Sequence, residues 1–247
     1  MSHPTLLETE LPDHSVDLFF TDPPYTRESL GAYSELARLA QAKLKPGGLC
    51  LAYSPHPHLP EVIRLMGEHL DYWWAFAVFQ TGPQPRIWER GIWVGWKPVL
   101  AFGKRPLGRR LTDTWLCDSI RGGGSDKRYH EWGQEVREAA YFIEALCPPG
   151  GLVVDPFCGG GTTLVAAKVT GRRWLGTEID PAYAAEARKR LEETPAGCSA
   201  SPDRDGGVGR PAGSEENQHS VPLGGAPGQA GGGARGPLRR TGQWAGG

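Results

Sequence analysis

The chain has 247 residues, of which 39% are hydrophobic and 22% charged, so its composition is that of an ordinary globular protein and excludes a fibrous or wholly disordered one. Its formal net charge of −1 excludes a polycation, and any contact with nucleic acid must therefore come from a local basic patch. The five cysteines are odd in number and form no C-x-x-C pair, so we expect no disulfide framework and no metal site. Because the chain shows no signal peptide and no long apolar run, we also expect no membrane contact and a cytoplasmic location.

Up to residue 194 the chain alternates between apolar runs and amphipathic stretches. The apolar runs predict strands at residues 16–21, 49–54, 71–80, 97–103, 152–155 and 173–179. Helical spacing and capping residues predict helices at residues 29–44, 60–70, 134–147, 162–167 and 181–193. This alternation predicts an α/β fold with a mostly parallel sheet and helices on both faces.

The composition changes after residue 194. Residues 195–247 contain 15 glycines and 6 prolines among 53 residues, and Trp244 is the only aromatic residue among them. Such a segment cannot bury enough apolar surface to offset the entropy lost on ordering. We therefore predict one folded domain, residues 1–194, followed by a disordered tail, residues 195–247.

The segment from Leu152 to Ala167 contains the first chemical motif. An apolar run typical of a buried strand ends at Asp155 and Pro156, and three glycines precede a helix that opens at Thr162 or Thr163. A helix N-terminus behind a glycine turn presents free N–H groups, which suit a carboxylate or a phosphate. The alternative is a tight strand-to-helix connection that binds nothing.

An acidic residue follows this turn at the spacing of a ribose-binding site. Glu178 lies at the tip of the next predicted strand, roughly 20 residues after the glycines, where a carboxylate can bind ribose hydroxyls. The turn is not G-x-G-x-x-G, which argues against a dinucleotide. The sequence Phe157-Cys158-Gly159-Gly160-Gly161 fits Phe-x-Gly-x-Gly and resembles the S-adenosylmethionine turn of methyltransferases.

The second motif, Asp22-Pro23-Pro24-Tyr25, directly follows the first predicted strand. Two prolines fix the backbone, so a carboxylate, a carbonyl and an aromatic ring are held in one rigid corner. That corner can accept hydrogen bonds from one amino group while the ring stacks on a planar heterocycle. The alternative is a turn whose aspartate bonds its own backbone.

Together the two motifs resemble those of the DNA amino-methyltransferases that modify adenine N6 or cytosine N4. Because Asp22-Pro23-Pro24-Tyr25 precedes the glycine turn, the order is similar to that of the permuted β group of this family. The resemblance implies a Rossmann-like methyltransferase fold, with S-adenosylmethionine as cofactor and DNA as partner. It implies that the cofactor is held by Asp155, Pro156, Phe157, Cys158, Gly159, Gly160, Gly161, Thr162, Glu178 and Gln134. It also implies that Asp22, Pro23, Pro24 and Tyr25 are catalytic: they bind a flipped-out base and orient its amino nitrogen.

The contact with DNA is expected between residues 104 and 128, where seven basic residues stand against three acidic ones. The DNA-binding candidates there are Lys104, Arg105, Arg109, Arg110, Lys127 and Arg128. A solvated surface loop is the alternative. Three further tryptophans, Trp88, Trp93 and Trp96, lie in a loop beside basic residues; stacking on nucleic acid is conceivable, but we expect most of them to pack in the core.

Asp22 before Pro-Pro-Tyr favours adenine N6 as the target, as it does in the family. Cytosine N4 and RNA remain alternative substrates. A third alternative is an inactive DNA-binding remnant, because Ser2-His3 stand where relatives carry a Gly-Asp pair that helps to bind the cofactor's adenine. The family also implies a role in restriction-modification.

Overall fold

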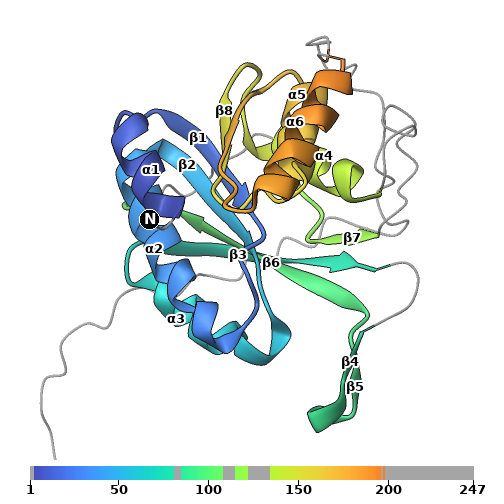
Figure 1. The fold of residues 1–247 in the computed structure, drawn as a ribbon. Coiled ribbons are helices and arrows are strands. Elements are labelled where there is room, and N and C mark those ends of the chain that lie inside the picture. The colour runs from blue at the N-terminus through green and yellow to red at the C-terminus, as the bar shows by residue number, and fades with distance from the viewer. Residues whose placement is uncertain (1–2, 81–84, 108–114, 122–133, 196, 198–247) are drawn as a thin grey trace, which may run out of the picture. The chain divides into compact units, whose positions relative to one another are not determined.

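The structure, a computed structural model, describes residues 3–80, 85–107, 115–121, 134–195 and 197 (Figure 1). Within these residues the chain forms a seven-stranded sheet with the order β7-β3-β6-β2-β1-β8-β9 and a separate two-stranded hairpin, β4-β5. The strands of the sheet are β1 (Val16–Thr21), β2 (Leu44–Tyr53), β3 (Asp71–Phe79), β6 (Trp96–Gly103), β7 (Ser119–Arg121), β8 (Leu152–Asp155) and β9 (Arg173–Gly176). The hairpin strands are β4 (Arg86–Ile87) and β5 (Ile92–Trp93).

The strands of the sheet run in one direction except for β6. The pairs β1-β2, β1-β8, β8-β9 and β3-β7 are parallel, whereas β6 is antiparallel to both β2 and β3. The carboxyl ends of the parallel strands therefore meet at one edge of the sheet, and β6 begins at that edge and ends at the opposite one.

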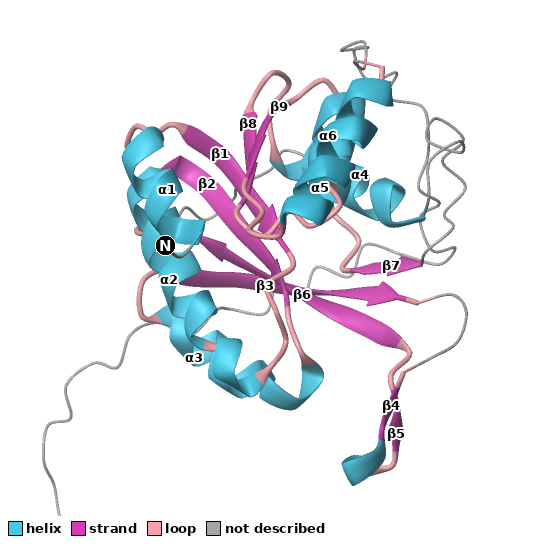
Figure 2. Cartoon of the chain, in the orientation of Figure 1, coloured by secondary structure: helices cyan, strands magenta, loops and turns pink. Residues whose placement is uncertain are grey.

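Six α-helices described by the structure cover the two faces of the sheet (Figure 2). They are α1 (His3–Glu10), α2 (Gly31–Lys43), α3 (Leu59–Gly67), α4 (Gln134–Leu146), α5 (Thr162–Val169) and α6 (Pro181–Glu193). One hydrophobic cluster joins the sheet to α1, α2 and α3, and another joins it to α4, α5 and α6.

Alternation along β1 produces these two cores. Leu18 and Phe20 belong to the cluster with α4, whereas Phe19 between them belongs to the cluster with α2. All three are at most 1% exposed, which is the burial expected of a central parallel strand. The predicted α/β fold with helices on both faces is confirmed.

Several boundaries differ from the prediction because long-range contacts set them. β9 ends at Gly176, and Glu178 lies in the loop beyond it, where the N–H of Thr177 donates to the carbonyl of Asp155. The segment between β3 and β6, expected to be a loop, carries the β4-β5 hairpin. Of the predicted tail, Pro195 and Gly197 are described, and the Gly197 N–H donates to the carbonyl of Lys168; the rest lies outside the described residues.

Candidate active site

The two sequence motifs meet at the carboxyl ends of β1 and β8. From this adjacent pair the chain continues to β2 on one side and to β9 on the other, which is the topological switch point where open α/β sheets bind ligands. The hydroxyl of Thr21 donates to Asp155 Oδ1 over 2.5 Å, and both residues are buried. Thr21, the residue before Asp22, is therefore bonded to Asp155, the last residue of β8, although the two lie 134 positions apart in the chain.

The carboxyl of Asp155 is shielded from solvent and is held by several donors. Burial raises its pKa to about 6, hydrogen bonds from Thr21, the Phe157 N–H and Thr163 oppose that rise, and the charge of Asp22 adds to it. The Phe157 N–H lies 3.0 Å from Asp155 Oδ1. Asp155 therefore fixes both the end of β1 and the start of the glycine turn.

The glycine turn requires glycine at two positions for conformational reasons. Gly159 and Gly161 have φ of +49° and +82°, in the left-handed region that other residues rarely adopt. A Cβ on Gly161 would also lie 2.9 Å from the Cβ of Ala187 on α6. Gly160 between them is half-buried, and its carbonyl accepts a hydrogen bond from Arg190 of α6 over 2.5 Å. The turn is thus clamped between β8 and α6, with Thr162 opening α5 directly behind it.

Glu178 connects the glycine turn to the N-terminus of α6. Its Oε2 accepts the N–H of Gly159 over 2.9 Å, and its Oε1 accepts the N–H of Asp180 over 2.9 Å. An ionised carboxylate has about four lone-pair positions, so this anchoring leaves acceptor capacity for a ligand. Cys158 in the turn is half-buried, and its pKa is raised to about 12 by burial and by the carboxylates of Asp155 and Glu178, which makes it a poor nucleophile.

The corner formed by Asp22-Pro23-Pro24-Tyr25 places Asp22 near the aromatic side chains of Tyr25 and Tyr33. Tyr25 is 39% exposed, and burial of its hydroxyl, followed by the charge of Asp22 and a hydrogen bond to it, raises its pKa. Tyr33, on α2, is fully buried, and its pKa is raised by burial and by the charge of Asp22. Both tyrosines therefore stay neutral, and the corner presents an acceptor carboxylate beside a partly exposed ring.

Sequence reasoning missed the residues that support this corner from β2 and β6. Thr21 pairs with Ala52, so Tyr53 follows on β2 beside Asp22. The carbonyl of Tyr53 accepts the Tyr33 hydroxyl over 2.9 Å, and the Lys97 Nζ lies 5.7 Å from the centroid of the Tyr53 ring. The sequence could have indicated Tyr53, because it is an aromatic residue near the end of the predicted 49–54 strand. The position of Lys97 beside it could be found only once the structure showed that β2 and β6 are neighbours.

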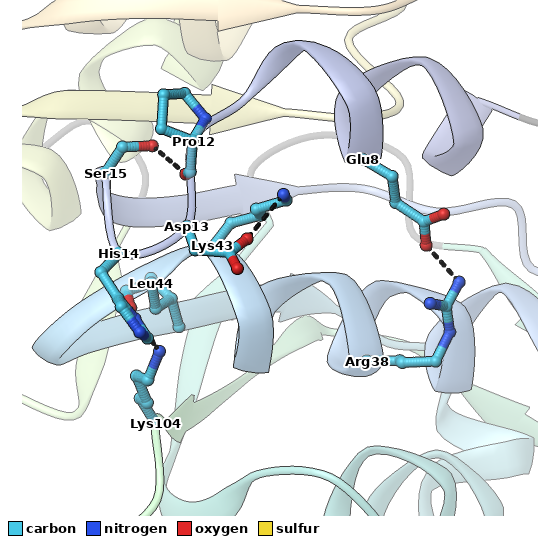
Figure 3. Close-up of polar contacts among 9 residues, drawn as sticks. All are labelled: Glu8, Pro12, Asp13, His14, Ser15, Arg38, Lys43, Leu44 and Lys104. Carbon is cyan, nitrogen blue, oxygen red and sulfur yellow. Dashed lines mark hydrogen bonds and ion pairs between the residues drawn. The ribbon is translucent and has the colours of Figure 1, made fainter.

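Two of the expected DNA contacts, Lys104 and Arg105, have partners within the chain. β6 ends at Gly103, opposite Leu49 and Asp71, so Lys104 and Arg105 lie at the sheet edge opposite the site. Lys104 is 8% exposed, and its ammonium donates to the carbonyl of Leu44 over 2.8 Å and to His14 Nδ1 over 2.5 Å (Figure 3).

The guanidinium of Arg105 is equally engaged. Its Nε donates to Asp71 Oδ1 over 2.7 Å, and its Nη2 donates to the carbonyls of Gly67 and Leu70 at the end of α3. Both cations therefore close the amino-terminal side of the sheet, and DNA binding by Lys104 and Arg105 stays a prediction that these contacts do not favour.

The remaining predicted contacts are not described. Arg109, Arg110, Lys127 and Arg128 lie outside the described residues, and so does the side chain of Gln134, the first residue of α4. Within the described part of the chain, no helix is long and apolar enough to cross a membrane, and no group of three or more metal-ligating side chains gathers.

The sheet order, the ligand edge at β1 and β8, and the glycine turn define a Rossmann-like methyltransferase. A family model for DNA methylases (N6_N4_Mtase) matches residues 81–189. A type II methyltransferase of Streptococcus pneumoniae, M2.DpnII, is 34% identical over 228 residues, which cover 74% of this chain and 85% of the relative. The putative methylase YubD of Escherichia coli is 37% identical over 93 residues, 38% of this chain and 39% of the relative. The chain therefore belongs to the N6/N4 DNA methylase family, whose cofactor is S-adenosylmethionine.

Solved structures agree on the fold. A putative DNA modification methylase of Thermus thermophilus, solved with S-adenosylmethionine, has a TM-score of 0.62 and 22% identity; the match covers 78% of this chain and 92% of that chain. The PvuII cytosine-N4-specific methyltransferase has a TM-score of 0.61 and 21% identity, and covers 77% of this chain and 84% of its own.

Proposed function

We propose that this protein transfers a methyl group from S-adenosylmethionine to the N6 amino group of adenine in DNA, and that it represents the permuted β group of the family. The observation that carries the proposal is the junction of the two motifs: Asp22-Pro23-Pro24-Tyr25 is fixed to Asp155 of the glycine-turn strand by the hydroxyl of Thr21. A base held at the first motif is thereby placed beside a cofactor held at the second.

The residues around the glycine turn fit the cofactor. The left-handed backbone at Gly159 and Gly161 opens a turn next to the N-terminus of α5, where free N–H groups suit the cofactor's carboxylate. Glu178 has lone pairs left for ribose hydroxyls, and Ile179 beside it, 69% exposed, offers an apolar surface to the cofactor's adenine. When bound, S-adenosylmethionine supplies a methyl group activated by a sulfonium.

The catalytic corner orients the amino group of the target base. The Asp22 carboxylate and the Pro23 carbonyl accept hydrogen bonds from the two N–H groups of that amine, which would direct the nitrogen lone pair toward the methyl group. Tyr25 stacks on the base after it has left the duplex. The charge of Asp22 offsets the positive charge that arrives at the nitrogen, so the same contact strengthens in the transition state.

We propose adenine rather than cytosine as the target because Asp22 precedes Pro-Pro-Tyr. Among the proteins that this chain resembles, aspartate at that position favours adenine. Cytosine N4 is the second candidate, and the PvuII enzyme with a similar fold has that specificity. M2.DpnII is a type II methyltransferase, and we extend a restriction-modification role to this chain from that relative.

The experiment that tests the proposal is nucleoside mass spectrometry of duplex DNA treated with purified protein and S-adenosylmethionine. We expect N6-methyladenine. Detection of N4-methylcytosine instead would show that cytosine, not adenine, is the target base. Methylation of an RNA substrate without methylation of DNA would show that DNA is not the substrate. If neither nucleic acid is modified and equilibrium dialysis detects no cofactor binding, the chain is an inactive remnant.

A further inference from the structure

The β4-β5 hairpin exposes large apolar side chains. Arg86 pairs with Trp93, and Ile87 with Ile92, next to a turn that Gly91 closes with φ of +63°. Trp88 is 75% exposed and Trp93 59% exposed, and neither belongs to the hydrophobic clusters of the described residues. Figure 2 shows the hairpin extending away from the seven-stranded sheet beyond β3 and β6. The expectation that most of these tryptophans pack in the core is therefore wrong for these two.

A single cation organises the two rings. The guanidinium carbon of Arg86 lies 4.0 Å from the centroid of the Trp93 ring and 5.2 Å from that of Trp88. Cation–π contacts of this kind hold a ring in place at an exposed site, and a stacked guanidinium keeps its edge N–H groups for other acceptors. The hairpin thus holds two indoles in a defined arrangement although it has no core of its own.

The hairpin leaves the sheet at the catalytic edge. β3 is parallel to the strands that carry the site, and its last residue, Phe79, pairs with Trp96, the first residue of β6. The Gln80 N–H donates to the carbonyl of Gly95, and the Val94 N–H to the carbonyl of Pro85, so the ladder continues into the hairpin. The exposed indoles therefore project from the edge where Asp22 lies, whereas Lys104 and Arg105 lie at the other.

The local charge favours a polyanion. Between residues 85 and 97 the chain carries Arg86, Arg90 and Lys97 against Glu89 alone. Phosphates provide the negative charge, and bases provide flat π faces that stack on aromatic side chains whatever their identity. A protein partner without an acidic surface could pack against the apolar rings but would leave the excess of cations without negative charge opposite them.

We propose that the β4-β5 hairpin is a DNA-docking element, in which Trp88 and Trp93 stack on bases next to the target while Arg86 and Arg90 contact phosphates. The inference rests on the proposed function, because it takes the substrate of the Asp22 corner to be DNA. It assigns DNA contact to residues that lie at the same edge of the sheet as Asp22, whereas Lys104 and Arg105 lie at the opposite edge.

The test uses the full chain with S-adenosylhomocysteine and a labelled duplex of about 20 base pairs that contains a mapped methylation site. Binding is measured by fluorescence anisotropy. Base–aromatic stacking of this kind is lost on alanine substitution, so we expect the Trp88→Ala/Trp93→Ala double variant to weaken duplex binding by about tenfold or more. The slope of log affinity against log salt should stay unchanged, because no charge has been removed.

Two matched variants separate stacking from a structural effect. Trp88→Phe/Trp93→Phe keeps flat rings and should retain most of the affinity. Trp174→Ala removes an indole that is 39% exposed on β9, at the other end of the strand order, and should bind the duplex as the wild type does. Melting temperature and cofactor affinity of the two hairpin variants should equal those of the wild type, since Trp88 and Trp93 belong to neither hydrophobic cluster of the described residues.

The outcomes distinguish this inference from the proposed function. If no methylated position can be mapped, the proposed function has failed and the inference falls with it. If the wild type methylates and binds the duplex but the double alanine variant binds equally well, the docking role alone is overturned. The docking role is also overturned if the double alanine variant binds the duplex normally but sediments as a smaller species than the wild type. The hairpin would then join two copies of the chain.

Discussion

At the scale of single residues, two carboxylates at the same edge of the sheet have different environments. Asp155 is 3% exposed and takes hydrogen bonds from the end of β1 and from the glycine turn. Asp22 follows β1 directly, in the corner that holds the reacting amine in the proposed mechanism. Their different environments lead to two different predictions.

The first prediction concerns Asp22. Asp22→Ala should lower kcat by a factor of about 100 or more and leave S-adenosylmethionine binding nearly unchanged, because the lost contact strengthens in the transition state and does not touch the cofactor. Steady-state methylation of duplex DNA and calorimetric titration with the cofactor measure the two effects. An Asp22→Ala protein that methylates at the wild-type rate would remove the motif from the mechanism.

The second prediction concerns Asp155 and pH. Its folded pKa of about 6 lies above the usual value of 3.8, so the folded state binds the proton more tightly than the unfolded state does. The stabilisation that this proton provides is complete below pH 3.8 and is lost as the pH rises toward 6. Asp155→Asn keeps a carbonyl acceptor for Thr21 and Phe157 but cannot ionise. Its stability relative to the wild type should therefore rise with pH across this window, by up to about 3 kcal/mol.

Urea unfolding of both proteins at several pH values between 4 and 7 measures that difference. A difference that is flat, or that falls as the pH rises, would mean that burial does not raise the pKa of Asp155.

At the scale of elements, the glycine turn connects β8, α5 and α6 through a backbone that side chains would distort. Gly161 has positive φ and lies against Ala187, so Gly161→Ala should strain the turn and destabilise the fold by about 1–3 kcal/mol. Because the strain displaces the N-terminus of α5, cofactor affinity should fall as well. Thermal unfolding with and without S-adenosylmethionine reports both effects.

Gly67 at the end of α3 is the matched control. A Cβ there would meet no atom within 4 Å, and its backbone does not have positive φ. Gly67→Ala should therefore be neutral or stabilising by up to about 1 kcal/mol. Equal losses from the two substitutions would show that the turn is not under special constraint.

At the scale of the whole molecule, we predict that residues 202–247 contribute little to the fold or to activity. Their glycine- and proline-rich composition cannot bury enough apolar surface to build a core. A protein that ends at Ser201 should melt within a degree or two of the full chain, by the size of effect expected when no packing is lost. A large fall in the melting temperature would show that these residues dock on the domain.

Target choice is also a property of the whole molecule. With Lys104 and Arg105 occupied, the proposed DNA contacts are the hairpin and Arg109, Arg110, Lys127 and Arg128. Phosphate contacts and stacking carry little sequence information, so we predict a methylated motif of about four bases or fewer and binding that weakens steeply with salt. Single-molecule sequencing of modified DNA maps the motif, and a strict site of six or more bases would contradict the prediction.

The sequence by itself determined the features that depend on residues adjacent in the chain. Asp22-Pro23-Pro24-Tyr25 and the glycine turn identified the family, and Asp180-Pro181 identified the start of α6, where Asp180 Oδ1 accepts the N–H of Ala182. Proline geometry, positive φ and helix capping act within a few residues, so a pattern along the chain is enough to find them.

Only the tertiary structure decided the roles that depend on partners far apart in sequence. Lys104 looked like a DNA contact until the fold placed it against His14 and Leu44, 90 and 60 positions away. Trp93 looked like a core residue until the sheet order placed it on a hairpin outside both cores. A cation or an indole has the same local pattern whether it is buried or exposed, because its surroundings come from strands that pair across the sheet.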